Sequence, residues 1–335
     1  MDYVNLGHSG LKVSRLCLGC MSYGDTSRGW HGDWVLSEDE SRPFIREAVE
    51  AGINFFDTAN MYSLGASEEV IGRLLPEFTK RDEIVVATKA FLPWRQAPNA
   101  GGLSRKALIQ AVDDSLTRLG MDYVDLFQTH WPGHGTNFDE TMETLDDLVR
   151  EGKVRIVGCS NEDAWGLMKS IETSNRLGTV RYHTIQNNFS LNNRRFEDAL
   201  AKVCRREGVS LIPYSPLAGG VLSGKYQDGA LPEGARFSAY LQHGGRQTLM
   251  AGRFVNEKSL ESTRRFMDIA KDAGMAPVTL ATAWSKQHDF VASTIVGVSK
   301  FDQLADILAA ADLELSADVM KACDAVTKDQ MYPMG

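Results

Sequence analysis

The alternation of short apolar segments with helix-like segments constrains the fold of this chain more than any other feature. The apolar segments are continuous runs, which are typical of parallel strands buried on both faces. Eight strands are predicted, at Arg15–Leu18, Asn54–Phe56, Ile84–Thr88, Val124–Gln128, Arg155–Gly158, Thr184–Gln186, Ser210–Pro213 and Ser293–Val296. A helix-like segment follows each strand, and this count predicts an α/β fold of the (β/α)8 type, the TIM barrel.

The helices between the strands are marked by their ends. Ser37 precedes three acidic residues, as expected at a capped N-terminus, and Ser67 opens a second helix-like run. Further helices are predicted at Ser104–Leu119, Asp139–Glu151, Glu162–Asn175, Phe196–Glu207, Ser259–Ala273 and Phe301–Ala311. Gly7 and Gly10 indicate an N-terminal β-hairpin. The long irregular stretch Ser215–Asn256, after strand seven, predicts a functional lid.

One domain spanning residues 1–335 is expected, because barrels of this kind reach such a length as one unit. The alternative is an open doubly wound sheet. That fold predicts a glycine-rich G-x-G-x-x-G turn after an early strand, and the sequence has none there.

Charge and hydropathy exclude several classes of partner. The formal net charge is −8 and no basic run is present, which argues against nucleic acid and anionic membrane surfaces. No apolar stretch approaches the ~18 residues of a membrane span. The N-terminus lacks the features of a signal peptide, so we expect a soluble cytoplasmic protein.

The five cysteines are too few and scattered for a disulfide framework, so free thiols are expected. Cys17 and Cys20 form a C-x-x-C pair, which is either a redox or zinc pair or simple packing near a strand. Packing is favoured, because no second pair or nearby histidine completes a zinc site. His130 and His134 are separated by a Pro-Gly turn, so no metal site is predicted.

Polar side chains recur where the predicted strands end. In a barrel these ends form one mouth, which is where catalytic residues gather. The strand-end residues are Asp57 and Tyr62, Lys89, His130, Ser160 and Asn161, Gln186, Tyr214, and Gly297 to Lys300. Each has an ordinary structural alternative, such as a loop cap for Asp57 or a core histidine for His130. Their recurrence at the same end of successive strands favours a functional site.

Four of these residues make a coherent proton-transfer site. Lys89 is expected to lower the pKa of the Tyr62 phenol, and Asp57 to hold Lys89 charged and in place. Tyr62 then donates a proton to an oxygen that His130 also contacts. Such a site suits hydride addition to a carbonyl group. A Schiff-base lyase using Lys89 is a less favoured alternative, because Asp57 would keep that amine protonated.

Several motifs, taken in order, resemble those of the aldo-keto reductases, and the likeness covers essentially the whole chain. The motifs are Leu16–Gly24, Asp57–Tyr62 with Ser67 and Glu68, Thr88-Lys89, His130-Trp131-Pro132, Gly158–Asn161 and Tyr214–Leu217. The branch that this chain resembles is the bacterial group related to aryl-alcohol dehydrogenases and potassium-channel β-subunits.

The resemblance implies a barrel that binds NADP(H) across its mouth. It implies a catalytic tetrad of Asp57, Tyr62, Lys89 and His130, with Tyr62 as the acid in reduction. The nicotinamide end would contact Ser160, Asn161, Gln186 and Tyr214, with Tyr214 stacked on the ring. The pyrophosphate and lid would involve Ser215, Leu217, Gly219, Ser223 and Lys225, and the adenosine end Gly297, Ser299, Lys300, Gln303 and Asp306.

The sequence departs from the family pattern at two places. Ser63 stands where glycine often follows the tyrosine, a change expected to be minor. Ser299 and Lys300 stand where an arginine often meets the 2′-phosphate, and Arg236 in the long loop is expected to help. Together with Lys225 these cations favour NADPH over NADH; surface solubility is the alternative explanation for each.

The expected partner is a small carbonyl compound. Trp30, Trp34, Trp94 and Trp131 fall in or beside predicted loops at the mouth and suggest an apolar wall for an aromatic or bulky substrate. Ordinary loop packing is the alternative. Oligomerisation is not indicated. Two other functions stay open: a regulatory subunit that senses bound nucleotide with little turnover, and physiological oxidation of an alcohol with NADP.

Overall fold

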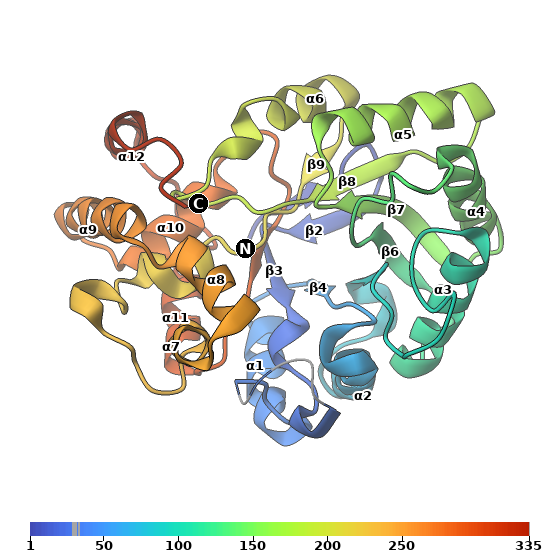
Figure 1. Cartoon of the computed structure of the whole chain (residues 1–335), viewed down its shortest axis with the longest axis horizontal. Coiled ribbons are helices and arrows are strands. Elements are labelled where there is room, and N and C mark those ends of the chain that lie inside the picture. Colours follow the sequence, from blue (N-terminus) through green and yellow to red (C-terminus); the bar gives the residue numbers. More distant parts are fainter. Residues whose placement is uncertain (29–31, 33, 335) are drawn as a thin grey trace.

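The computed structural model describes residues 1–28, 32 and 34–334, and a ring of parallel strands surrounded by helices forms its centre (Figure 1). The ring runs in the order β10-β3-β4-β5-β6-β7-β8-β9. Its strands are β3 (Leu16–Gly19), β4 (Phe55–Asp57), β5 (Val85–Ala90), β6 (Val124–Thr129), β7 (Val154–Ser160), β8 (Tyr182–Gln186), β9 (Ser210–Leu211) and β10 (Thr294–Val296).

The ring closes between β9 and β10 through backbone hydrogen bonds. The Leu211 N–H donates to the Phe290 carbonyl at 2.7 Å, and the Ile295 N–H donates to the Pro213 carbonyl at 2.9 Å. Every strand of the ring thus has a partner on both sides, which confirms the predicted (β/α)8 barrel. An antiparallel hairpin of β1 (Tyr3–Asn5) and β2 (Lys12–Ser14) precedes it, also as predicted.

Neighbouring residues along one strand face different cores. Cys17, Phe55 and Leu126 belong to a cluster inside the ring, together with Leu6 and Val13 of the N-terminal segment. Leu18, Phe56, Val86 and Phe127 belong to a larger cluster between the strands and the helices. Burial on both faces is why the strands appear in the sequence as continuous apolar runs.

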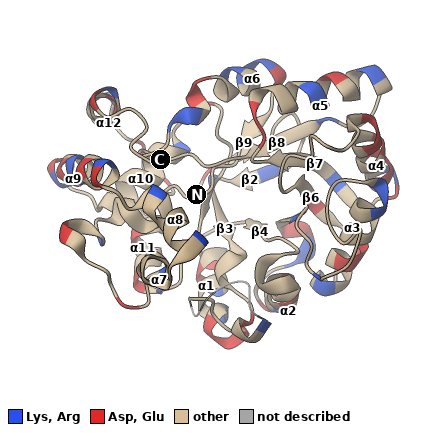
Figure 2. Cartoon of the chain, viewed as in Figure 1, with Lys and Arg blue, Asp and Glu red and all other residues tan. Residues whose placement is uncertain are grey.

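The helices around the ring are α1 (Glu38–Glu50), α2 (Ala66–Phe78), α3 (Arg105–Leu119), α4 (Phe138–Arg150), α5 (Ala164–Leu177), α6 (Leu200–Glu207), α9 (Glu257–Asp272), α10 (Pro277–Lys286) and α11 (Asp302–Leu308). Helix α12 (Ala317–Asp329) lies outside them and packs against α9. Side-chain caps begin several of them. Ser37 and Glu40 form a reciprocal capping box at α1, and Asp163 accepts from the Gly166 N–H at α5. Figure 2 shows acidic and basic residues intermixed on outer helices such as α4, α5 and α9.

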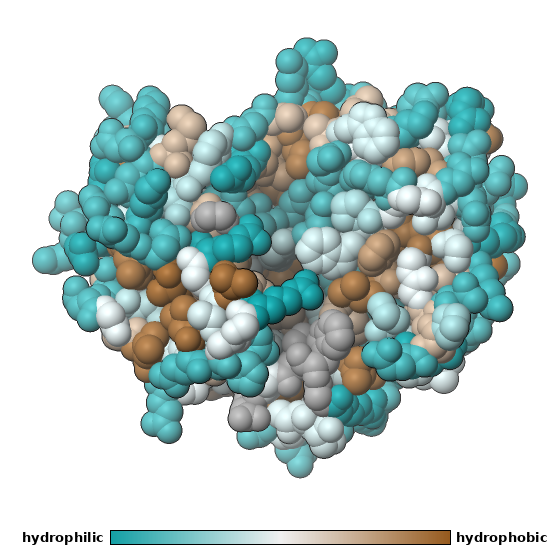
Figure 3. Space-filling model, in the orientation of Figure 1, coloured by the Kyte–Doolittle hydropathy of each residue, from teal (hydrophilic) through white to brown (hydrophobic). Residues whose placement is uncertain are grey.

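The segment between β9 and α9 differs from the irregular stretch expected at Ser215–Asn256. It contains α7 (Arg236–His243) and α8 (Gly245–Phe254). Helices α10 and α12 were likewise not predicted. Apolar residues gather on the face near α7 and α8 (Figure 3), where α8 exposes Leu249 and Met250. No helix among the described residues has the length and apolar character needed to cross a bilayer.

Candidate active site

The structure brings the four residues of the predicted tetrad together where β4, β5 and β6 end. Asp57 is the last residue of β4, Lys89 is the next-to-last residue of β5, and His130 follows β6 directly. Tyr62 begins a short 3-10 turn, η3 (Tyr62–Gly65), that leads into α2. Parallel strands in register place these ends at one edge of the barrel, as the sequence predicts.

Lys89 and Asp57 form a buried ion pair. The Lys89 Nζ lies 2.5 Å from Asp57 Oδ2 and donates a second hydrogen bond of 2.8 Å to the Thr58 carbonyl. Asp57 Oδ1 accepts from the side-chain amides of Gln128, at 3.1 Å, and Gln186, at 2.9 Å. Burial alone would lower the pKa of Lys89, but the attraction of Asp57 and the contact with Tyr62 outweigh it and raise that pKa. Lys89 is therefore held in its charged form.

These two amide contacts add to the expectations from the sequence. Gln128 was not predicted as a site residue, although it stands two positions before His130. Gln186 is expected from the sequence to hold a nicotinamide amide, and that role stays a prediction; its amide nitrogen also supports Asp57 and lies 3.3 Å from Gln128 Oε1. The two glutamine amides fix the Asp57 carboxylate, which in turn binds the Lys89 ammonium.

Tyr62 lies against both Lys89 and His130. The Lys89 Nζ is 5.0 Å from the centre of the phenol ring, and the His130 ring meets the Tyr62 ring edge to face at 5.8 Å between centroids. Burial raises the pKa of Tyr62, and Lys89 lowers it by less, so the net shift is upward. Lys89 lowers the pKa of Tyr62, as expected from the sequence, but desolvation of the phenol raises that pKa by more. The phenol is consequently protonated at neutral pH, which is the form that donates a proton.

His130 is buried and neutral. Burial, and then the nearby positive charge of Lys89, lower the pKa of His130 well below its ordinary value. Its Nδ1 has no hydrogen-bond partner within the described part of the chain. A neutral imidazole donates a hydrogen bond from one nitrogen without carrying a charge. The ring is thus suited to orient a polar oxygen, not to act as the principal acid.

The loop after Tyr62 has a left-handed backbone. Ser63 has φ 46°, Leu64 has φ 50° and Gly65 has φ 91°. For residues that carry a Cβ this conformation costs roughly 1–2 kcal/mol each. The left-handed φ at Ser63 explains why glycine suits this position, so the serine is a strained substitution.

The residues expected at the nicotinamide end form a hydrogen-bonded chain. Ser160 Oγ donates to the Gln186 carbonyl at 2.8 Å, and the Asn161 amide donates to the His130 carbonyl at 2.9 Å. The Tyr214 hydroxyl donates to Asn161 Oδ1 at 2.8 Å. Burial raises the pKa of Tyr214 to about 12. These contacts connect the ends of β7 and β8, and the segment after β9, to His130 of the predicted tetrad.

A group of three cations lies beside the segment that follows β9. Burial, and then the positive charges of Arg236 and Lys300, lower the pKa of Lys225, so both cations lie close enough to act on its ammonium. None of them forms an ion pair with a carboxylate of the described residues. Nearby, Ser215, Ala218, Gly219 and Gly220 all have positive φ, and the Lys225 side chain packs on Gly220. Uncompensated cations beside such a turn fit a phosphate-bearing ligand.

The remaining expected cofactor residues lie in two segments. Leu217 and Ser223 flank the glycine turn, and Ser223 Oγ donates to the Gly220 carbonyl at 2.8 Å. Gly297 and Ser299 lie between β10 and α11, while Gln303 and Asp306 lie on α11.

The three described tryptophans of the predicted apolar wall lie in different surroundings, and the wall itself stays a prediction. Trp34 lies beside Arg236, with 5.6 Å between its ring and the guanidinium, and Trp94 lies under the Arg118 guanidinium at 4.7 Å. Trp131, directly after His130, is 44% exposed. Trp30 lies outside the described residues.

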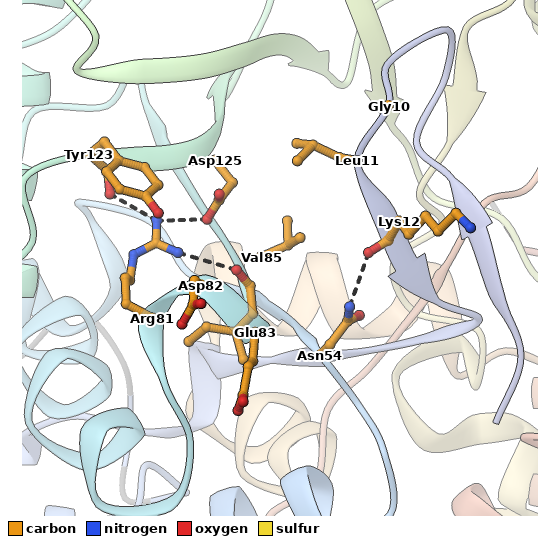
Figure 4. A pocket seen from close by; sticks show the side chains of 11 residues that line it. Gly10, Leu11, Lys12, Asn54, Arg81, Asp82, Glu83, Val85, Tyr123 and Asp125 are labelled. Atoms are coloured by element: carbon orange, nitrogen blue, oxygen red, sulfur yellow. Dashed lines mark hydrogen bonds and ion pairs between the residues drawn. The ribbon is translucent and has the colours of Figure 1, made fainter.

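A cavity of about 210 Å³ lies at the opposite end of the barrel, where the strands begin (Figure 4). Two of its charged groups form an ion pair: Arg81 lies 2.7 Å from Asp125 and its guanidinium is 4.1 Å from the centre of the Tyr123 ring. It contains no residue of the predicted site. The buried titratable residues of the predicted tetrad converge at the other end of the barrel, where the sequence predicts the active site.

His134, Glu162 and Asp163 are a group of described residues with ligand atoms within 4.8 Å of one another. Their polar atoms already have other partners. His134 Nε2 donates to Glu162 Oε1 at 2.7 Å, and Asp163 caps α5. The N-terminus of a helix also disfavours a cation. We therefore assign no metal to this group.

Comparison with known proteins agrees with this geometry. The model of the Aldo/keto reductase family matches residues 15–328. Protein tas of Escherichia coli (strain K12) is 35% identical, with 99% of each chain covered. A putative aryl-alcohol dehydrogenase of Schizosaccharomyces pombe is 36% identical over 95% of this chain and 93% of its own. A probable voltage-gated potassium channel subunit beta of Oryza sativa subsp. japonica is 32% identical, with 98% of each covered. The predicted branch is confirmed, and the chain belongs to the aldo/keto reductase family of oxidoreductases.

Proposed function

We propose that this protein reduces an aldehyde or ketone to the alcohol with NADPH, and that Tyr62 is the proton donor. The observation that carries the proposal is the buried set of Tyr62, Lys89, Asp57 and His130. It holds a protonated phenol beside a fixed ammonium and a neutral imidazole. Such a set has a proton to give and two groups that stabilise negative charge on an oxygen.

The residues divide the work as follows. His130 donates a hydrogen bond to the carbonyl oxygen and orients it. When bound, the nicotinamide supplies the hydride. Tyr62 transfers its hydroxyl proton to the oxygen as negative charge develops there, and Lys89 stabilises the phenolate that remains. Asp57 keeps Lys89 in place throughout, supported by the amides of Gln128 and Gln186.

The phosphate-bearing form of the cofactor is favoured by the three cations near the glycine turn. Lys225, Arg236 and Lys300 provide positive charge that no described carboxylate neutralises. A 2′-phosphate adds about two negative charges, which such a group binds through charge-assisted hydrogen bonds. NADH lacks that phosphate, so these cations should bind it less tightly than NADPH.

An aromatic or bulky apolar carbonyl compound is the proposed substrate class. Trp94 and Trp131 lie in loops that follow β5 and β6, the strands that carry Lys89 and lead to His130. The relative named as an aryl-alcohol dehydrogenase acts, by its name, on alcohols of that class.

Steady-state oxidation of NADPH and NADH with a panel of aromatic and aliphatic carbonyls tests the proposal. We expect multiple turnovers, faster with NADPH and with aromatic aldehydes. A single turnover followed by slow release of the nucleotide would instead support a nucleotide-sensing subunit, the alternative that stays open for this branch.

A further inference from the structure

The proton donor sits on a backbone segment that needs support from its surroundings. Ser63, Leu64 and Gly65, which follow Tyr62, are all left-handed. Residues with a Cβ disfavour this conformation, and it persists only where neighbouring contacts hold it. The residues that contact the end of this segment therefore control where the phenol lies.

Arg118 of α3 makes that contact. A Cβ on Gly65 would lie only 2.6 Å from Arg118 Cδ, so the stem of Arg118 packs directly on the last residue of the loop. Its guanidinium Nε donates to Glu68 Oε2 at 2.6 Å, and a further nitrogen donates to Ser115 Oγ at 3.2 Å. The Arg118 side chain is 9% exposed and that of Glu68 is fully buried.

The same pair reaches the strand that carries Lys89. Thr88 Oγ1 donates to Glu68 Oε1 at 2.5 Å, and Thr88 directly precedes Lys89 in β5. One carboxylate thus connects Arg118 to the backbone next to the ammonium. The guanidinium also lies 4.7 Å from the ring of Trp94, in the loop that follows β5.

We propose that Arg118 is a positioning residue that holds the Tyr62 loop and the Lys89 strand in one fixed arrangement and couples both to Trp94. This inference rests on the proposed function, because it concerns the placement of the proposed proton donor. Arg118 acts through Gly65 and Glu68, so its loss moves the phenol relative to the ammonium while the residues beside the cofactor cations stay unchanged.

The expected effect follows from that displacement. Misplacement of a reacting group by about 1 Å lowers a rate by up to about 100-fold. A phenol that moves away from Lys89 also loses the positive charge that partly offsets its burial, so its pKa rises further. The reaction then slows, and the high-pH limb of its rate profile moves to higher pH.

The test replaces both charges of the pair, Arg118→Met with Glu68→Gln, so that no buried charge is left without a partner. The matched control is Arg81→Met with Asp125→Asn. That pair also joins a guanidinium to a buried acid and an aromatic ring, but at the far end of the barrel (Figure 4). Rates are expressed per NADPH-binding site, measured by fluorescence titration, so that loss of folded protein does not count.

We expect the Arg118 pair to lower kcat per site roughly 10- to 100-fold and to move its high-pH limb upward. The affinity for NADPH should be unchanged. The control variant should have the same kcat per site and the same high-pH limb as the wild type, even if its melting temperature is lower.

Arg118→Lys provides a second test if the double variant does not fold. It keeps the charge opposite Glu68 but not the planar contact with Trp94, and a smaller loss of kcat is expected. The inference is overturned if the Arg118 variants keep the wild-type kcat per site and the wild-type high-pH limb. It is also overturned if the control variant changes kcat and the limb as much as the Arg118 pair does. In either case the proposed function would still hold if the wild type turns over NADPH and a Tyr62→Phe variant does not. Absence of such turnover would overturn both.

Discussion

Lys89 Nζ lies 2.5 Å from Asp57 Oδ2, and both side chains are buried between the ends of β5 and β4. Each charge is stable inside the protein only because the other is present. A buried pair of this kind is strongly destabilised when one partner is removed. The Lys89–Asp57 ion pair therefore contributes to the stability of the fold as well as to the proposed proton transfer.

Asp57→Asn should lower the free energy of unfolding by about 3–5 kcal/mol, because it leaves the Lys89 ammonium buried without its counter-ion. Urea unfolding measures this loss. The matched control is Glu50→Gln, which removes an exposed ion pair with Arg46 and should change the free energy by less than about 1 kcal/mol. Equal effects of the two substitutions would contradict the account of the buried pair.

The rate of reduction should be constant through neutral pH. Burial raises the pKa of Tyr62 above its ordinary value of about 10, so the phenol stays protonated and able to donate. The rate falls only as pH rises through that raised pKa, and oxidation of the alcohol increases over the same range. Single-turnover rates against pH measure this; a high-pH limb near neutrality would count against Tyr62 as the donor.

Stability should fall in mild acid because of His288. Its ring is surrounded by Phe189, Trp284 and Phe290, and burial lowers its pKa to about 4. The unfolded chain binds a proton near pH 6.5 and the folded chain only near pH 4. The stabilisation is therefore complete above pH 6.5 and decreases as pH falls to 4, by roughly 3 kcal/mol.

His288→Gln provides the comparison for that effect. The variant has no imidazole to titrate, so the difference in unfolding free energy between wild type and variant should change across this window. A difference that is independent of pH between 7 and 4 would show that His288 does not have a lowered pKa.

Lys300→Gln should weaken NADPH binding roughly 10-fold or more, because a charge-assisted hydrogen bond contributes about 1.5–3 kcal/mol. Binding of NADH, which lacks the 2′-phosphate, should be nearly unaffected. Fluorescence titration with both nucleotides measures the ratio, and Lys321→Gln, on the exposed face of α12, is the control. An equal loss of affinity for NADPH and NADH would show that Lys300 does not bind the 2′-phosphate.

The parts of the structure that follow local sequence rules were predicted correctly. The ring strands bury both faces, so their apolar runs are visible in the sequence, and strand ends such as Asp57 and Lys89 follow directly from them. The cap at Ser37 marks the start of a helix by chemistry that acts over three residues.

Features that depend on contacts distant in sequence were missed. Gln128 and Gln186 are recognisable as supports only when β6 and β8 bring their amides to Asp57. The helix α10 is apolar on most of its surface and is buried, so it lacks the polar face that marks α4. The shift in the pKa of Tyr62 was predicted downward because the desolvation of the phenol cannot be read from its neighbours in the chain.

The most direct test of the proposed mechanism is hydride transfer by Tyr62→Phe in a single turnover with NADPH and an aromatic aldehyde. The substitution removes only the hydroxyl group, so NADPH should bind with unchanged stoichiometry. We predict that the transfer rate falls by a factor of at least about 100, because a positioned general acid contributes roughly 10²- to 10⁴-fold. A transfer rate equal to that of the wild type, with NADPH bound, would contradict the assignment of Tyr62 as the proton donor.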